Sequence, residues 1–131
     1  MLLQFCLIDD INELDKACVY AVSDIFAMPS QVDSFGIVYL EAWAHKKPVI
    51  ACRHNPQETF IDDGRDGRLI HYDDHEELAE VILEMLCNNE KRKLMGENGF
   101  KKVQEIYHWD RVVDQIYGVY KNLVNAKIAV H

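Results

Sequence analysis

Long apolar runs are missing from this sequence, and so are basic runs of more than three residues. No apolar stretch approaches the ~18 residues of a membrane-spanning helix, and the first residues lack the charged n-region and the long h-region that are typical of a secretion signal. Basic residues number 14 against 22 acidic ones, for a formal net charge of −8. This balance argues against nucleic-acid binding through a basic face. We therefore predict no transmembrane segment and no nucleic-acid partner.

Cysteine is sparse and scattered. The four residues stand singly, with no close pair, at Cys6, Cys18, Cys52 and Cys87. Three of them lie in apolar runs, where a free cysteine behaves as a small hydrophobic residue. This pattern suits a reducing compartment rather than a disulfide framework, so we predict a cytoplasmic protein.

A hard-cation loop is also missing. The acidic run at residues 73–80 lacks the ligand spacing and the tight glycine turn that such a loop needs. We interpret the run as the solvated start of a helix, where acidic side chains favour the positive end of the helix dipole. No metal site is expected.

Short apolar runs alternate with longer helical patterns along the 131 residues, which is typical of βα units around a parallel sheet. The predicted strands are residues 3–8, 24–28, 48–52 and 68–71. The predicted helices are residues 9–21, 35–45, 57–62, 76–87, 90–107 and 110–124. We therefore predict one α/β domain, Rossmann-like and three-layered, with a parallel sheet of about four strands.

Two acids, Asp33 and Glu41, enclose seven residues that open a strongly apolar helix. A helix N-terminus presents free N–H groups and partial positive charge, which suits a diphosphate. Asp33 and Ser34 stand where an N-cap belongs. With ~1.5 Å of rise per residue, the two carboxylates are expected on the same side and ~12 Å apart along the axis. That spacing fits two ends of an extended ligand.

Glu41 has apolar neighbours on both sides in the sequence, so its helix is expected to be buried. A buried carboxylate needs a partner, because an unpaired buried charge is costly. Two alternatives remain open. A pair of ligand hydroxyls is one, and a Lys or Arg from elsewhere in the chain is the other.

Several ordered segments resemble one family, the retaining GT-B glycosyltransferases of the family-4, or group 1, type, which use nucleotide sugars. The resemblance includes the strand and Pro-Ser loop before Asp33, the stretch from Asp33 to Glu41, and the helix and strand after it. It continues through the acid-glycine turn at residues 62–70 and the aromatic segment that begins at Tyr107. It covers nearly the whole chain.

The resemblance implies a role for each matching residue. Asp33 would be the catalytic position and would face the hydroxyls of the donor sugar. The amides of Phe35 and Gly36 would approach the sugar and the diphosphate. The remaining donor-binding positions are Ile37 and Val38 beside phosphate and ribose, Glu41 on the ribose hydroxyls, and Ile8 at the base.

Two departures from the family pattern stand out. Lys46 occupies the helix C-cap position where the family has glycine, and a non-glycine residue in the left-handed conformation costs about 1 kcal/mol. The loop at residues 53–56 is one residue shorter than the family's glycine loop. We therefore expect an altered cap and an altered donor loop.

The resemblance is limited to the later part of the second domain of a two-domain enzyme. Residues 1–131 are thus interpreted as a partial C-terminal, donor-nucleotide-binding domain, with the acceptor domain and the basic diphosphate clamp missing. The full enzyme would transfer a sugar from a nucleotide-diphosphate sugar to a hydroxyl acceptor, without a metal or other cofactor. This chain alone is expected to be inactive. The alternatives are a GT-B-type sugar-nucleotide epimerase and a non-catalytic α/β binding module.

The last predicted helix carries a broad apolar stripe. It comprises Val112, Val113, Ile116, Tyr117, Tyr120, Leu123 and Val124. Such a stripe favours association when nothing covers it. We therefore predict that the chain can self-associate through this helix.

Overall fold

The computed structural model describes residues 4–32 and 34–128, and its centre is a parallel sheet with the strand order β1-β2-β3. β1 is Phe26–Ala27, β2 is Val49–Cys52 and β3 is Gly67–Ile70. Phe26 pairs with Val49, and Val49 pairs with Gly67. The parallel α/β sheet that we predicted is confirmed, with three strands in the described part of the chain.

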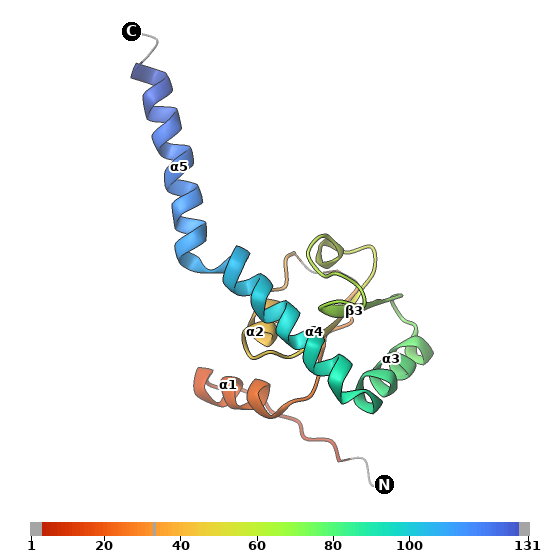
Figure 1. Ribbon diagram of the computed structural model, residues 1–131. Coiled ribbons are helices and arrows are strands. Elements are labelled where there is room, and N and C mark those ends of the chain that lie inside the picture. The colour runs from red at the N-terminus through yellow and green to blue at the C-terminus, as the bar shows by residue number, and fades with distance from the viewer. Residues whose placement is uncertain (1–3, 33, 129–131) are drawn as a thin grey trace.

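Helices pack on both faces of this sheet (Figure 1). The α-helices are α1 (Glu13–Val22), α2 (Ile37–Ala44), α3 (His75–Cys87), α4 (Asn89–Lys102) and α5 (Trp109–Ile128). A 3₁₀ turn, Pro56–Thr59, follows β2, and a π-helical turn, Val103–Tyr107, joins α4 to α5. The layered arrangement predicted from the sequence is therefore present.

The predicted strand at residues 3–8 is wrong for residues 4–8, while Leu3 lies outside the described residues. Residues 4–8 have no regular structure, and Phe5 and Leu7 are 92% and 97% exposed. A strand is stable only where a neighbour pairs its backbone and a core covers its side chains. Neither condition is met here within the described chain, although the apolar run has the composition of a strand.

The middle strand, β2, is buried on both faces, which explains its uninterrupted apolar sequence. Successive side chains of a strand point to opposite faces. Val49 and Ala51 therefore join the core cluster on the side of α1 and α2. Ile50 and Cys52 join the cluster that α3 and α4 cover. β2 therefore contributes side chains to both core clusters.

Side-chain caps set the start of three helices, α1, α3 and α4. α1 begins later than predicted because Asn12 is its N-cap, with Oδ1 accepting the Asp15 amide at 2.9 Å. Asp74 caps α3 in the same way, accepting the Glu77 amide at 2.8 Å. The predicted helix at residues 90–107 is divided, because α4 ends at Lys102 and the π-helical turn follows.

The carboxyl end of α2 closes in a Schellman turn. Lys46 adopts the left-handed conformation with φ of 57°, so it takes the glycine-like position despite its side chain. The Lys47 amide donates to the Ala42 carbonyl at 2.9 Å, and the Lys46 amide donates to the Trp43 carbonyl at 2.8 Å. α4 crosses this turn at Gly96, where a Cβ atom would lie 1.9 Å from the Lys46 carbonyl oxygen.

Trp43 anchors the same end of α2 in the core. Its indole N–H donates to the Asp66 carbonyl at 2.9 Å, and a Cβ atom on Gly99 would lie 2.1 Å from its ring. The Asp66 side chain is 1% exposed and forms an ion pair with Lys102. Burial raises the pKa of Asp66, while Lys102 and the backbone amide of Asp62 favour its charged form. The turn before β3 is thereby fixed to α2 and α4.

The last helix, α5, extends away from the sheet (Figure 1). Most of its described apolar side chains are exposed, as Trp109 is by 75% and Tyr120 by 64%. Self-association through this helix stays a prediction. Among the described helices, none combines the length and the apolar character needed to cross a bilayer.

Candidate functional site

An open hollow of about 420 Å³ lies at the amino end of α2. Its lining comprises Met28, which follows β1, and Ser34, Phe35, Gly36, Ile37 and Val38. Four of these, residues 35–38, are predicted donor-binding residues, and the fold brings them together. The hollow lies beyond the carboxyl end of β1, and open α/β sheets hold their ligands at that edge.

Gly36 sets the start of α2. It is the N-cap, with φ of 77° and ψ of 61°, a left-handed conformation that glycine adopts at little cost. The prediction that Ser34 helps to cap a helix starting at Phe35 is wrong, because the helix begins two residues later. Glycine has no side chain to offer, so the first amides of α2 receive no hydrogen bond from an N-cap side chain.

Two predicted site residues, Ile8 and Glu41, are not part of this lining. Asp33, the predicted catalytic residue, lies outside the described residues, so its role and its distance from Glu41 stay predictions. Ile8 is 53% exposed in the segment before α1. Glu41 lies further along α2, on the side that faces α1.

Aromatic side chains connect the hollow to the core. The Phe35 ring lies 5.0 Å from the Phe60 ring and 6.2 Å from the Tyr107 ring, measured between centroids. Phe60 also contacts Trp43 edge-on at 5.9 Å. The sequence assigned no site role to Phe60 or Tyr107, because segments so far apart in the chain meet only in the fold.

Two donors from α1 hold the Glu41 carboxylate. Lys16 Nζ lies 3.0 Å from Oε1, and the Tyr20 hydroxyl donates to Oε2 at 3.1 Å. A basic residue from elsewhere in the chain was one of the two predicted alternatives, and it is present. Hydrogen bonds to Glu13 and Glu41 raise the pKa of Lys16. Burial, and then the bond to Glu41, raise the pKa of Tyr20 to about 12.

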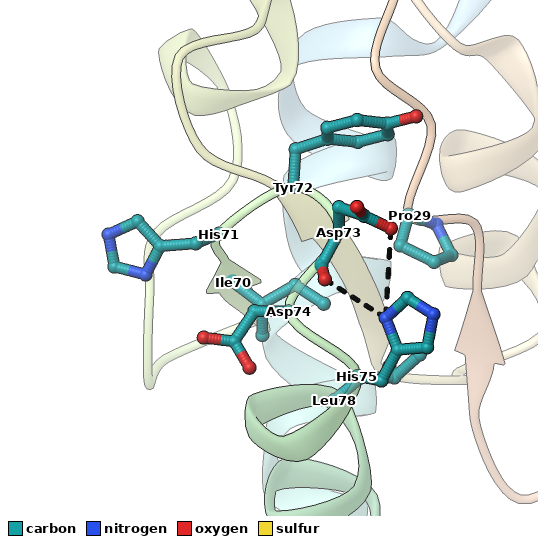
Figure 2. A pocket seen from close by; sticks show the side chains of 8 residues that line it. All are labelled: Pro29, Ile70, His71, Tyr72, Asp73, Asp74, His75 and Leu78. Carbon is teal, nitrogen blue, oxygen red and sulfur yellow. Dashed lines mark hydrogen bonds and ion pairs between the residues drawn. The ribbon is translucent and has the colours of Figure 1, made fainter.

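A second hollow, of about 310 Å³, lies beyond the carboxyl end of β3 (Figure 2). It is lined by Pro29, residues 70–75 and Leu78. Next to it, ligand atoms of His71, Asp74 and Glu77 lie within 4.8 Å of one another, close enough to share a cation. Each acid already has a structural contact, since Asp74 caps α3 and Glu77 accepts the His71 amide at 2.6 Å. The expectation of no metal stays a prediction.

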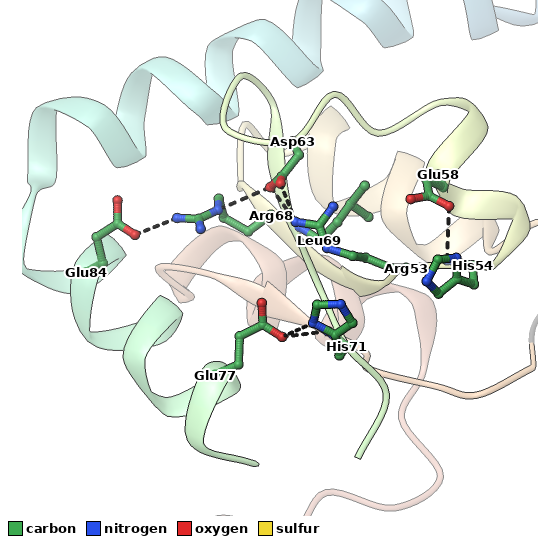
Figure 3. A network of polar contacts seen from close by, with 9 residues as sticks. All are labelled: Arg53, His54, Glu58, Asp63, Arg68, Leu69, His71, Glu77 and Glu84. Atoms are coloured by element: carbon green, nitrogen blue, oxygen red, sulfur yellow. Dashed lines mark hydrogen bonds and ion pairs between the residues drawn. The ribbon is translucent and has the colours of Figure 1, made fainter. Parts of the chain in front are cut away.

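A network of charged side chains links the turn before β3 to α3 (Figure 3). Asp63 accepts hydrogen bonds from Arg53 at 2.7 Å and from the Leu69 amide at 3.0 Å. Arg68 contacts both Asp63 and Glu84. Partial burial opposes ionisation, yet the Leu69 amide and Arg53 hold the pKa of Asp63 below its ordinary value. This network supports β3 and α3 rather than the hollow at α2.

The family model described as "Glycosyl transferases group 1" matches residues 4–102. A curated relative, an uncharacterized glycosyltransferase of Methanocaldococcus jannaschii, is 34% identical over 115 residues. That alignment covers 88% of this chain and 31% of the relative. The chain spans about a quarter to a third of the length of the curated relatives it matches.

Solved structures share the fold. Sucrose-phosphate synthase from Thermosynechococcus elongatus has a TM-score of 0.83 at 27% identity, over 91% of this chain and 30% of that chain. Anabaena HepE in complex with UDP-glucose has a TM-score of 0.74 at 23% identity, over 79% of this chain and 29% of that chain. The predicted fold class, a Rossmann-like domain of GT-B type, is confirmed by these likenesses.

Proposed function

This chain belongs to the group 1 glycosyl transferases, and we propose that it holds the nucleotide-diphosphate sugar donor within a longer enzyme. The observation that carries the proposal is the hollow at the amino end of α2, which residues 35–38 line. The diphosphate would lie against the first amides of α2. The whole enzyme would transfer the sugar to a hydroxyl acceptor with retention of configuration, and without a metal.

The physical basis for donor binding is the start of α2. A helix N-terminus carries about half a unit of positive charge, and the missing side chain at Gly36 lets a phosphate approach the backbone. The lining residues, Met28 and residues 34–38, include no basic side chain. Affinity for the nucleotide should therefore be weak in this chain, with a Kd of about 1 mM, or about −4 kcal/mol.

Glu41 would bind the ribose. It lies four residues beyond Ile37, about 6 Å along the helix axis. An extended nucleotide can therefore reach the first amides of α2 with its phosphates and Glu41 with its ribose. The complex of HepE with UDP-glucose supports a nucleotide sugar as the class of ligand. Asp33 would face the hydroxyls of the donor sugar.

We propose that sugar transfer is a property of the whole protein. Transfer requires donor and acceptor to be aligned and shielded from water, and this chain spans about a quarter to a third of its relatives' length. The chain alone should therefore show no turnover. A cytoplasmic location is proposed from the four unpaired cysteines, which suit a reducing compartment.

An NMR titration with UDP-, GDP- and ADP-glucose tests donor binding. We expect Glu41→Ala to weaken binding tenfold or more, because a hydrogen bond to a charged group contributes about 1.5–3 kcal/mol. Glu80→Ala, which removes an exposed acid on α3, is the matched control and should leave affinity unchanged. If Glu41→Ala left affinity unchanged but lowered the melting temperature strongly, Glu41 would be a structural acid.

A further inference from the structure

Both oxygens of the Glu41 carboxylate are held by one face of α1. Lys16 contacts Oε1 at 3.0 Å and Tyr20 contacts Oε2 at 3.1 Å, from positions 25 and 21 residues earlier in the chain. Because Lys16 and Tyr20 are four residues apart on a helix, their side chains lie on the same face. The sequence spacing thus offered a signal for this pair, but only the fold places Glu41 opposite it.

Tyr20 is a fixed donor. Its side chain is 7% exposed, and its ring lies 5.3 Å from the His45 ring and 5.7 Å from the Phe26 ring. The hydroxyl keeps its proton near neutral pH and can donate it to only one acceptor. Glu41 Oε2 is nearer than the Val38 carbonyl, which lies 3.4 Å away. Tyr20 therefore restrains the Glu41 carboxylate close to Val38, which lines the hollow at α2.

The carboxylate still has room for a ligand. A carboxylate offers about four acceptor positions, two on each oxygen. With one donor from α1 on each oxygen, each oxygen keeps an acceptor position for a hydroxyl. The side chain of Glu41 is 31% exposed, so a ligand can reach it. Neighbouring ribose hydroxyls present two donors that match these two positions.

We propose that Lys16 and Tyr20 are positioning residues that orient the Glu41 carboxylate toward the two ribose hydroxyls of the nucleotide. The inference rests on the proposed donor-binding function and assigns it two further residues, on a different helix. A flexible carboxylate loses rotamer freedom when it binds a ligand. A carboxylate already held by Lys16 and Tyr20 has lost that freedom beforehand, which favours ribose binding.

The test compares two nucleotides in the 131-residue chain. The probes are whichever of UDP, GDP and ADP binds best and its 2′,3′-dideoxy analogue, and the readout is the ratio of their Kd values. We expect a ratio of about tenfold in the natural chain. Tyr20→Phe, which keeps the ring, and Lys16→Met should each reduce the ratio about threefold. Affinity for the dideoxy analogue should not change.

Two further variants separate positioning from stability. Lys16→Arg keeps the positive charge and should restore most of the ratio. Glu13→Gln removes the other ion pair of Lys16, at 2.9 Å, and should leave the ratio unchanged. An equal loss of affinity for both nucleotides would mean a structural role and would overturn the inference.

The remaining outcomes distinguish this inference from the proposed function. If Glu41→Ala abolished the ratio while Tyr20→Phe and Lys16→Met left it unchanged, only the positioning roles would be overturned. If the natural chain bound both nucleotides equally, or bound none, the ribose contact of Glu41 would fail and the inference with it.

Discussion

The two ends of α2 differ in packing and in exposure. At the carboxyl end Trp43 is fully buried, and α4 approaches so closely that only glycine fits at Gly96 and Gly99. At the amino end Phe35 and Ile37 are 40% and 66% exposed, beside an open hollow. One helix is thus anchored at one end and open at the other. Changes at the carboxyl end should alter stability, and changes at the amino end should alter binding.

The largest expected effect is at the anchored end. Lys102→Met would leave the buried Asp66 carboxylate without its ion-pair partner. Removing one member of a buried pair costs about 3–5 kcal/mol, so the free energy of unfolding in urea should fall by about that amount. Lys101→Met, at an exposed neighbouring position, is the control and should change it by less than about 0.5 kcal/mol. Similar small losses in both variants would contradict the anchoring role of Lys102.

Gly96→Ala tests the close contact between α4 and the end of α2. The new Cβ atom would meet the Lys46 carbonyl oxygen, and overpacking of this kind costs about 1–3 kcal/mol. We expect a loss of about 2 kcal/mol in the free energy of unfolding. Gly118→Ala on α5, where nothing lies within 4 Å, should be neutral or stabilising by up to about 1 kcal/mol. A destabilisation of equal size in both variants would show that packing is not the cause.

A fall in pH should lower the free energy of unfolding by a smaller amount. A hydrogen bond from Lys102 lowers the pKa of Asp62, and Lys91 and Arg68 lower that of Glu84. Carboxyls with depressed pKa values stabilise the fold above their unfolded pKa, near 4, and this contribution is lost as the pH falls through the folded value.

Asp66 acts in the opposite direction, because burial raises its pKa. Carboxyls with a lowered pKa are more numerous, because the pKa values of Asp63 and Glu77 are lowered as well as those of Asp62 and Glu84. The free energy of unfolding should therefore fall between about pH 5 and pH 2. A free energy of unfolding that stayed constant over this range, measured by urea titration at each pH, would contradict the prediction.

The smallest expected change in stability is at the open end. Gly36→Ala places a side chain at φ of 77°, which costs about 1 kcal/mol. Gly36→Ala should weaken nucleotide binding by more than it lowers the free energy of unfolding, because the new methyl group blocks the approach of a phosphate to the backbone. Unfolding in urea and NMR titration on the same sample measure both quantities. An unchanged affinity would place the diphosphate elsewhere.

The sequence predicted those helices and strands whose spacing of apolar residues depends directly on how the element is buried. β2 was found because burial on both faces leaves a continuous apolar run, and α3 because one apolar stripe repeats along it. The strand at residues 3–8 was wrong, since an apolar run does not reveal whether a partner strand is present. The family resemblance predicted residues 35–38 as donor-binding positions, and they line the hollow at α2, although the left-handed cap at Gly36 was not anticipated.

Contacts between distant segments could not be read in the same way. The pairing of Glu41 with Lys16 and Tyr20 depends on how α1 lies against α2, and so does the aromatic group around Phe35. The sequence left the partner of Glu41 open between a ligand and a basic residue. Both alternatives are compatible in the fold, because each carboxylate oxygen has only one donor from α1.

The central claim is that α2 binds a nucleoside diphosphate at its amino end, and a map of amide chemical shifts tests it most directly. With the isotope-labelled chain and UDP, GDP or ADP at millimolar concentration, we predict shifts of the amides at residues 35–38. The chemical shifts of the Trp43, Gly96 and Gly99 amides should not change. Shifts confined to residues 71–77, or no shift with any of the three nucleotides, would contradict the claim.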